Sequence, residues 1–149
     1  MATYNKFDVF VEHLTSKVHD LFGSGATVDD IKIYLSNTTP NASTMAVKAD
    51  LAEIAAGNGY TAGGASVTPN GSRSAGTFTL TGTKVTWTAS GGSIGPFRYV
   101  VLYNDTPTSP ADPLIAWWDR GSSLTLNAGE SFSVKFNNSD TTGTIFTLA

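Results

Sequence analysis

Beyond residue 60, polar and apolar residues alternate along short stretches that are separated by turn-forming residues. Val85, Trp87 and Ala89 alternate with Thr86 and Thr88, and a period of two is typical of a strand with one buried face. The pattern predicts strands at 76–81, 83–89, 97–103, 114–120, 122–127, 131–137 and 143–148. Many short strands of this kind predict a mainly β fold, an antiparallel β-sandwich or jelly roll.

The beginning of the chain has a different pattern. Between residues 5 and 22 the apolar side chains fall at helical spacing, which predicts an amphipathic helix that ends at Gly23. Phe7, Val9 and Val11 also alternate, so a strand is the competing prediction for the start of this segment.

Two further elements are predicted before the sandwich. The stretch DIKIYLS, residues 30–36, is typical of a strand. Asp50 and Glu53 stand three residues apart, the spacing of a capping box, and predict one short additional helix that stops at Gly57.

The alternation also predicts which side chains fill the core. Most of the interior should come from Trp87, Phe97, Tyr99, Val101, Leu124, Leu126, Phe132, Val134, Phe136, Phe146 and Leu148. Trp117 and Trp118 are adjacent on a predicted strand, so they must face opposite sides of the sheet. One of them can fill the core, while the other is exposed or is covered by a helix, a loop or a partner. Burial of both is the open alternative, because FRYVVLYN is apolar on both faces.

Composition narrows the class of protein. The 149 residues suit one domain, with a helix-containing region, 1–60, packed on a β-sandwich, 61–149. Only 14% of the residues are charged, the net charge is −3, and Lys and Arg form no cluster, so nucleic acid is not an expected partner. There is no cysteine and no apolar run of membrane-spanning length. The N-terminus lacks the basic and apolar regions of a signal peptide, so synthesis in a cytoplasm is expected.

One short motif suggests catalysis. GGSIG, with Ser93 at its centre, matches the nucleophile elbow of serine hydrolases. That elbow requires a helix after the serine and a histidine later in the chain. Here Pro96 and a predicted strand follow, and both histidines, His13 and His19, lie upstream. We therefore predict that residues 90–96 join two strands, with no histidine against Ser93.

The other polar candidates also favour structural roles. His13 and His19 are six residues apart, so they should not share a helical face, and we expect surface or boundary histidines rather than a zinc site. Asp29 and Asp30 lack a calcium-loop sequence and are expected in a solvated turn. Five N-x-S/T sequons predict surface loops, at Asn37, Asn41, Asn70, Asn104 and Asn137.

Several segments together resemble one family. KIYLSNTTP, KADLAEIAAGNGYTAGG, WTASGGSIGPFRYVVLYND, WWDRGSSLTLNAGESFSVKF and GTIFTLA look like parts of a family of small virion proteins of tailed bacteriophages, over nearly the whole chain. The resemblance implies a non-enzymatic structural protein on the surface of the phage head, a capsid decoration (cement) protein. The alternative is a tail or head-fibre component that binds a receptor or glycan. No catalytic, metal-binding or cofactor-binding residue comes with the family.

The expected partners follow from this role. The major capsid protein and further copies of the chain, as a homotrimer, are the expected contacts, with neither nucleic acid nor membrane involved. The first six residues precede the predicted helix and have no predicted strand or cap of their own, so a partner is expected to hold them. The candidate interface residues are Met1, Ala2, Thr3, Tyr4, Asn5, Lys6, Tyr103, Trp117 and Trp118.

Overall fold

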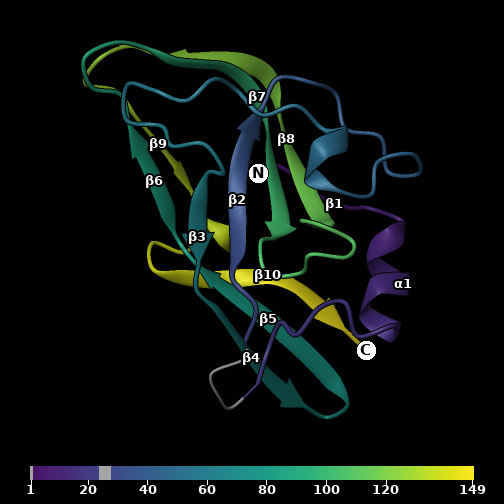
Figure 1. Ribbon diagram of the computed structural model, residues 1–149. Helices are drawn as coiled ribbons and strands as arrows, with labels where there is room; N and C mark the ends of the chain where they lie inside the picture. Colours follow the sequence, from purple (N-terminus) through teal and green to yellow (C-terminus); the bar gives the residue numbers. More distant parts are fainter. Residues whose placement is uncertain (1, 24–27) are drawn as a thin grey trace.

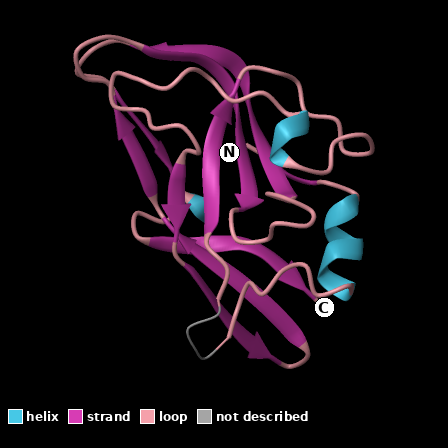
Figure 2. Cartoon of the chain, viewed as in Figure 1, coloured by secondary structure: helices cyan, strands magenta, loops and turns pink. Residues whose placement is uncertain are grey.

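The computed structural model describes residues 2–23 and 28–149, and most of its regular structure consists of strands (Figures 1 and 2). The strands are β1 (Tyr4–Lys6), β2 (Ile31–Ser36), β3 (Ala65–Val67), β4 (Pro69–Ser74), β5 (Thr77–Thr83), β6 (Val85–Thr88), β7 (Ile94–Asn104), β8 (Leu114–Leu126), β9 (Ser131–Val134) and β10 (Thr142–Leu148). The helical elements are α1 (Val9–Thr15) and two 3-10 turns, η1 (Lys48–Asp50) and η2 (Phe136–Asn138).

Three antiparallel sheets make up the fold. The largest has the strand order β1-β8-β7-β2-β3, and two smaller sheets have the orders β10-β5-β4 and β6-β9. Figure 1 shows the smaller sheets lying across one side of the large sheet and η1 on the opposite side. The helix α1 lies next to the C-terminal end of β10, where its Phe10 ring packs against Phe146 at 5.5 Å. The predicted mainly β, antiparallel, sandwich-like fold with an N-terminal helix is therefore confirmed.

The main core lies between the large sheet and the two smaller ones. It joins Ile33 of β2 and Phe97 of β7 to Leu80 of β5 and Trp87 of β6. Five of the predicted core residues are buried here, namely Trp87, Phe97, Leu126, Phe136 and Phe146. Tyr99 and Val101 are buried on the opposite face of the large sheet, so their assignment to this interior was wrong; the pairing of β7 with β8 shifts its register between Phe97 and Tyr99. Leu124, Phe132 and Val134 are half-buried at its margin. Leu148 is 44% exposed, so its assignment was wrong; it lies near the free end of β10, beyond the part of that strand that the core reaches.

The opposite face of the large sheet is also buried. Tyr34, Val101 and Tyr103 form a second apolar cluster there, which the chain covers with Phe7 and Leu51. The central strands β2 and β7 are therefore buried on both faces. This double burial explains why FRYVVLYN is apolar at consecutive positions.

The N-terminal segment differs from the predicted helix of residues 5–22. Tyr4–Lys6 forms strand β1, opposite Ala116–Trp118 of β8, so its backbone is extended. The helix α1 is only seven residues long, and Lys17 follows it with a φ of 61°. A residue in the left-handed conformation commonly ends a helix and turns the chain in a new direction. Pairing with β8 thus overrides the helical spacing of the apolar side chains.

The predicted second helix was misplaced. Only the 3-10 turn η1 forms, and residues 52–56 have no regular structure. The Asp50 carboxylate accepts hydrogen bonds from the N–H groups of Ala46 and Val47, at 2.9 and 3.1 Å. Both residues precede the 3-10 turn η1. Glu53 makes long-range bonds instead of capping a helix.

The remaining differences concern strand boundaries. Strands β3 and β4 were not predicted, because the stretch from 61 to 76 is rich in glycine and other turn-forming residues. The predicted strands 114–120 and 122–127 form one strand, β8, which continues through Gly121 at a φ of 95°. Strand β9 ends at Val134 rather than at 137, and η2 follows it.

Candidate functional site

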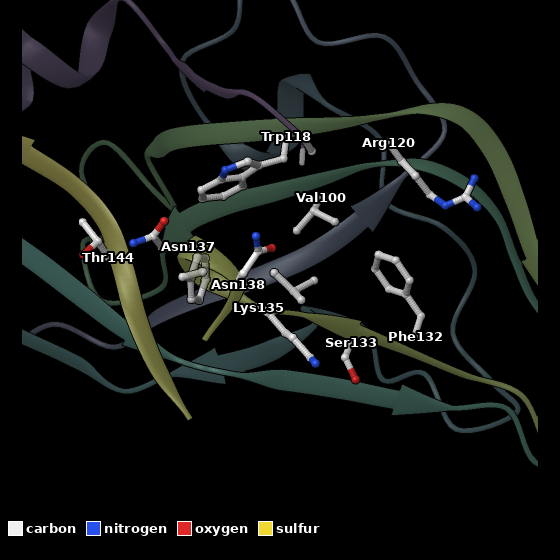
Figure 3. Close-up of a pocket in the computed structure, with 12 residues that line it drawn as sticks. Val100, Trp118, Arg120, Phe132, Ser133, Lys135, Asn137, Asn138 and Thr144 are labelled. Carbon is white, nitrogen blue, oxygen red and sulfur yellow. The ribbon is translucent and has the colours of Figure 1, made fainter. Parts of the chain in front are cut away.

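A groove lies between strands β8 and β9, and it has a volume of about 280 Å³ (Figure 3). Strand β8 contributes Trp118 and Arg120 to one side, and the continuous run from Phe132 to Asn138 forms another. Val100, Thr144 and Ala2 complete the lining. A groove with an apolar lining and a few polar groups is the usual form of a binding site.

The floor of the groove is aromatic. Trp118 is half-buried and packs against Phe136, with ring centroids 5.5 Å apart, and against Tyr4 at 5.7 Å. Phe132 is also half-buried, and Phe97 and Trp87 support it from the core at 5.0 and 6.5 Å. These contacts fix the rings in place, so a ligand would meet a preformed apolar surface.

Polar side chains surround this floor. The Arg120 guanidinium donates hydrogen bonds to the carbonyl and the hydroxyl of Ser122, both at 3.0 Å. Lys135 forms an ion pair of 2.5 Å with Asp140, which holds the pKa of that carboxyl below its usual value. Asn137 and Asn138 both have left-handed backbone conformations, at φ of 48° and 58°. Asparagine tolerates this conformation better than most residues, which is consistent with the tight turn after β9.

A second hollow of about 430 Å³ adjoins the groove. Ala2, Trp118, Asn137 and Thr144 line both hollows, so the indole of Trp118 lies between them. Thr3 and Tyr4 line only the second hollow. The exposed start of the described chain therefore runs along the edge of the site.

The structure separates the two tryptophans as predicted. Trp118 packs on the main core, and Trp117 packs on the second cluster. Trp117 lies 4.6 Å from the ring of Phe7, which follows β1. The chain itself thus partly covers both tryptophans, and Trp118 lines both of the hollows described above.

Other predicted interface residues have structural roles. Tyr103 is buried and its hydroxyl donates to the Gly63 carbonyl at 2.9 Å, so it cannot extend an exposed face beside Trp117. Tyr4, Asn5 and Lys6 pair with β8, so the expectation that this segment has no strand was wrong. Ala2 and Thr3 are exposed, while Met1 lies outside the described residues.

Most groove residues were not predicted as site residues. Phe132, Val134 and Phe136 alternate regularly and were assigned to the core interior. Arg120 and Lys135 are far apart in the sequence and carry no motif. The alternation of aromatic residues was the available signal, but it does not reveal that the two strands diverge.

Ser93 lies in a loop between two strands, as predicted. Strand β6 ends at Thr88 and β7 begins at Ile94, without an intervening helix. Ser93 is exposed, and its carbonyl accepts a hydrogen bond from the Asn58 side chain at 2.8 Å. His19 bonds to Asn104 instead, so no triad is assembled around this serine within the described residues.

The two histidines are buried, which corrects their prediction as surface or boundary residues. Their rings lie 5.7 Å apart because the chain turns back after α1. His19 Nδ1 lies 3.0 Å from the Asn104 amide, whereas His13 Nδ1 and His19 Nε2 are buried without a hydrogen-bond partner in the described structure. Burial and the neighbouring His13 lower the pKa of His19 to about 4.

The predictions for Asp29 and for one sequon are also corrected. Asp29 is buried and accepts the Asp20 N–H at 2.7 Å, while Asp30 is exposed as predicted. Asn104 is fully buried between His19 and Asp29, so it does not lie on a surface loop. The other four sequon asparagines are exposed, namely Asn37, Asn41, Asn70 and Asn137. Asn70 lies in strand β4 and Asn137 in the 3-10 turn η2, so these two are not in loops as predicted.

In residues 2–23 and 28–149, no group of three or more His, Asp or Glu side chains is arranged to hold a metal ion. No helix there is long and apolar enough to cross a membrane.

Comparison with known proteins adds no relative: no protein-family model, curated protein sequence or solved structure matches this chain.

Proposed function

We propose that this protein is a non-enzymatic structural protein of a tailed-bacteriophage virion, a capsid decoration protein that binds the assembled head. The structural observation that supports this role is the aromatic groove between β8 and β9, held on a rigid antiparallel scaffold. Its lining offers apolar, amide and cationic groups, which act by packing and hydrogen bonding. The resemblance of the sequence segments to phage virion proteins specifies the partner.

A decoration protein works by differential binding. It stabilises the assembled lattice because it binds that lattice better than it binds loose capsid subunits. Preformed aromatic side chains favour such binding, since little side-chain entropy is lost when the partner docks. Trp118 and Phe132 meet this condition because neighbouring rings already hold them.

The proposed assembly is a homotrimer on the outer surface of the head, bound to the major capsid protein. Closed cyclic symmetry is the usual arrangement of identical subunits, and three-fold positions recur on an icosahedral shell. Light scattering should give a mass three times that of the 15.6 kDa chain. A monomeric mass at all concentrations would contradict the trimer.

The decisive experiment mixes the purified protein with undecorated heads and, separately, with free capsid subunits. We expect saturable binding to heads alone and a higher disruption temperature of the decorated heads. Equal binding to both forms would contradict the decoration role. Deletion of the first six residues is an unsuitable variant because it removes β1 from the sheet. Replacement of Ala2 and Thr3 alone tests the exposed part of that segment.

A tail or head-fibre component that binds a receptor glycan is the second candidate. Trp118 favours it, because an indole beside the amides of Asn137 and Asn138 resembles the surface that packs against a sugar ring. A glycan array separates the two proposals. Binding of one glycan class by the isolated protein, combined with location at the tail, would replace the decoration role.

A further inference from the structure

The groove between β8 and β9 has a charge opposite to that of the whole chain. The protein has a net charge of −3, yet the described residues that line the groove include Arg120 and Lys135 and no carboxylate. Two cations in the lining of an apolar groove complement a ligand that carries negative charge beside an apolar side chain.

Arg120 is available for such a ligand. Its guanidinium donates to the neutral oxygens of Ser122, and no carboxylate in the described residues forms an ion pair with it. The adjacent Asp119 is already bound to Arg98 through two hydrogen bonds of 2.8 Å, and it also accepts the Gly121 N–H. A carboxylate from outside can bind a guanidinium through two parallel hydrogen bonds.

Lys135 is the less available of the two cations, because it already forms an ion pair with Asp140. Its partner Asp140 is an exposed carboxylate, with a side chain that is 74% accessible to solvent. Exposed ion pairs contribute little to stability, so replacing Asp140 by a ligand carboxylate as the partner of Lys135 requires little free energy. Lys135 can therefore contribute positive charge to a bound complex.

The strands beside the groove indicate the shape of the occupant. Among the described strands, β9 pairs only with β6, so one of its edges has no strand neighbour. The short strand β1 pairs with β8 only at Ala116–Trp118 and does not continue along Arg120. Unpaired strand edges are where extended peptides add to a sheet. Figure 3 shows Trp118, Val100, Lys135 and Phe132 spread along the groove, which suits an elongated ligand.

We propose that this groove binds an extended acidic peptide segment of a protein partner, with an Asp or Glu carboxylate on Arg120 and an apolar side chain on the floor formed by Trp118 and Phe132. This inference rests on the proposed docking role and names the chemistry of the segment that docks. In the assembled particle that segment would belong to the capsid protein.

The test uses the full chain and a peptide array. The probes are nine-residue peptides that alternate Glu or Asp with Leu, Val or Phe, alongside matched sets with Gln or Asn, and with Lys, at the acidic positions. Affinity is measured for the array members, and amide and indole signals are followed by NMR. Trp117 and Trp87 provide internal reference indoles outside the groove lining.

We expect members of the acidic set to bind about ten-fold more tightly than their amide counterparts at low salt, and to shift the indole signal of Trp118 most. Arg120→Gln should weaken this binding about ten-fold, and adding Lys135→Gln should weaken it further. Arg73→Gln is the matched control, because it removes the same charge from an exposed position on β4.

Three results would overturn the inference. The first is equal binding of acidic and amide peptides, and the second is an unchanged affinity in Arg120→Gln. The third is binding of sialyllactose or galacturonate oligosaccharides at Trp118 in place of any peptide, which would assign the groove to acidic glycans. Head binding separates this inference from the decoration role. If the protein binds acidic peptides but not heads, the decoration role is refuted and the peptide site stands. If the double variant Arg120→Gln, Lys135→Gln binds heads as well as the unaltered protein does, the decoration role stands and the groove is not the docking site.

Discussion

The side chains on the two faces of the large sheet are covered to different extents. On one side, the chain covers Tyr34, Tyr103 and Leu51 so that at most about 1% of each is exposed, and Trp117 there is half-buried. On the other side, beside β9, the cover is incomplete and Trp118 and Phe132 stay half-exposed. Both sides are rich in aromatic residues, so composition does not explain the difference.

Polar bonds close the first side. The Glu53 carboxylate accepts hydrogen bonds from Tyr60 at 2.7 Å, from the Gly63 N–H at 2.8 Å and from Lys48 at 2.7 Å. Lys48 also lies over the ring of Tyr34, 5.1 Å from its centroid. This network attaches the segment between β2 and β3 to the sheet. The groove beside β9 has no comparable network among the described residues.

The largest expected effect is at Phe136, which belongs to both the core and the groove. Phe136→Ala should lower the free energy of unfolding by about 3–5 kcal/mol, because it removes a buried ring from the main core. Chemical denaturation measures the effect. Phe22→Ala is the control, since Phe22 is 50% exposed, and an equal loss there would contradict the assigned core.

Breaking the polar network should have the next largest effect. Glu53→Gln removes the charge that Lys48 faces in a largely buried site, and we expect a loss of about 3 kcal/mol. Glu12→Gln, at an exposed helical position, should change stability by less than about 0.5 kcal/mol. If both variants unfold at the same denaturant concentration, the network does not close this side.

Acid should destabilise the folded protein through its two buried histidines, His13 in α1 and His19 shortly after it. His19 has a folded pKa of about 4 and an ordinary value of 6.5, because burial and His13 disfavour its charged form, while Asp29 acts in the opposite direction. Between these values the unfolded chain binds a proton that the native chain does not. Stability should therefore fall as the pH drops from about 6.5 to 4, by on the order of 2–3 kcal/mol.

Denaturation curves measured across this pH range provide the check. His13, whose pKa is lowered in the same direction, adds to the effect. His19→Gln should flatten the pH dependence over this range. An unchanged slope in that variant would assign the acid sensitivity to other groups.

The smallest effect on stability is expected at the open side. Arg120→Gln should change the free energy of unfolding by less than about 0.5 kcal/mol, because the side chain is exposed and its hydrogen bonds within residues 2–23 and 28–149 go to Ser122. Its effect on peptide affinity should be far larger. A stability loss comparable to that of Glu53→Gln would mean that Arg120 supports the fold instead of a ligand.

The sequence by itself determined the mainly β class and much of the core. Strict alternation around Trp87 reports burial on one face, and Trp87 is buried as predicted. The alternation also placed Trp117 and Trp118 on opposite faces, because adjacent residues in a strand always point apart. The strand-to-strand loop at Ser93 followed from local turn chemistry alone.

Only the tertiary structure decided which of these elements meet. Tyr4–Lys6 is a strand because β8 offers it a hydrogen-bonding edge, although its surroundings have helical spacing. His13 and His19 are neighbours because the chain reverses at Lys17, and Asn104 joins them from a distant strand. The groove exists because β9 pairs with β6 and diverges from β8. Alternation reports how one strand divides its side chains between the two faces of a sheet. The space between two strands depends on pairing between residues that are distant in sequence, and a local pattern does not encode that pairing.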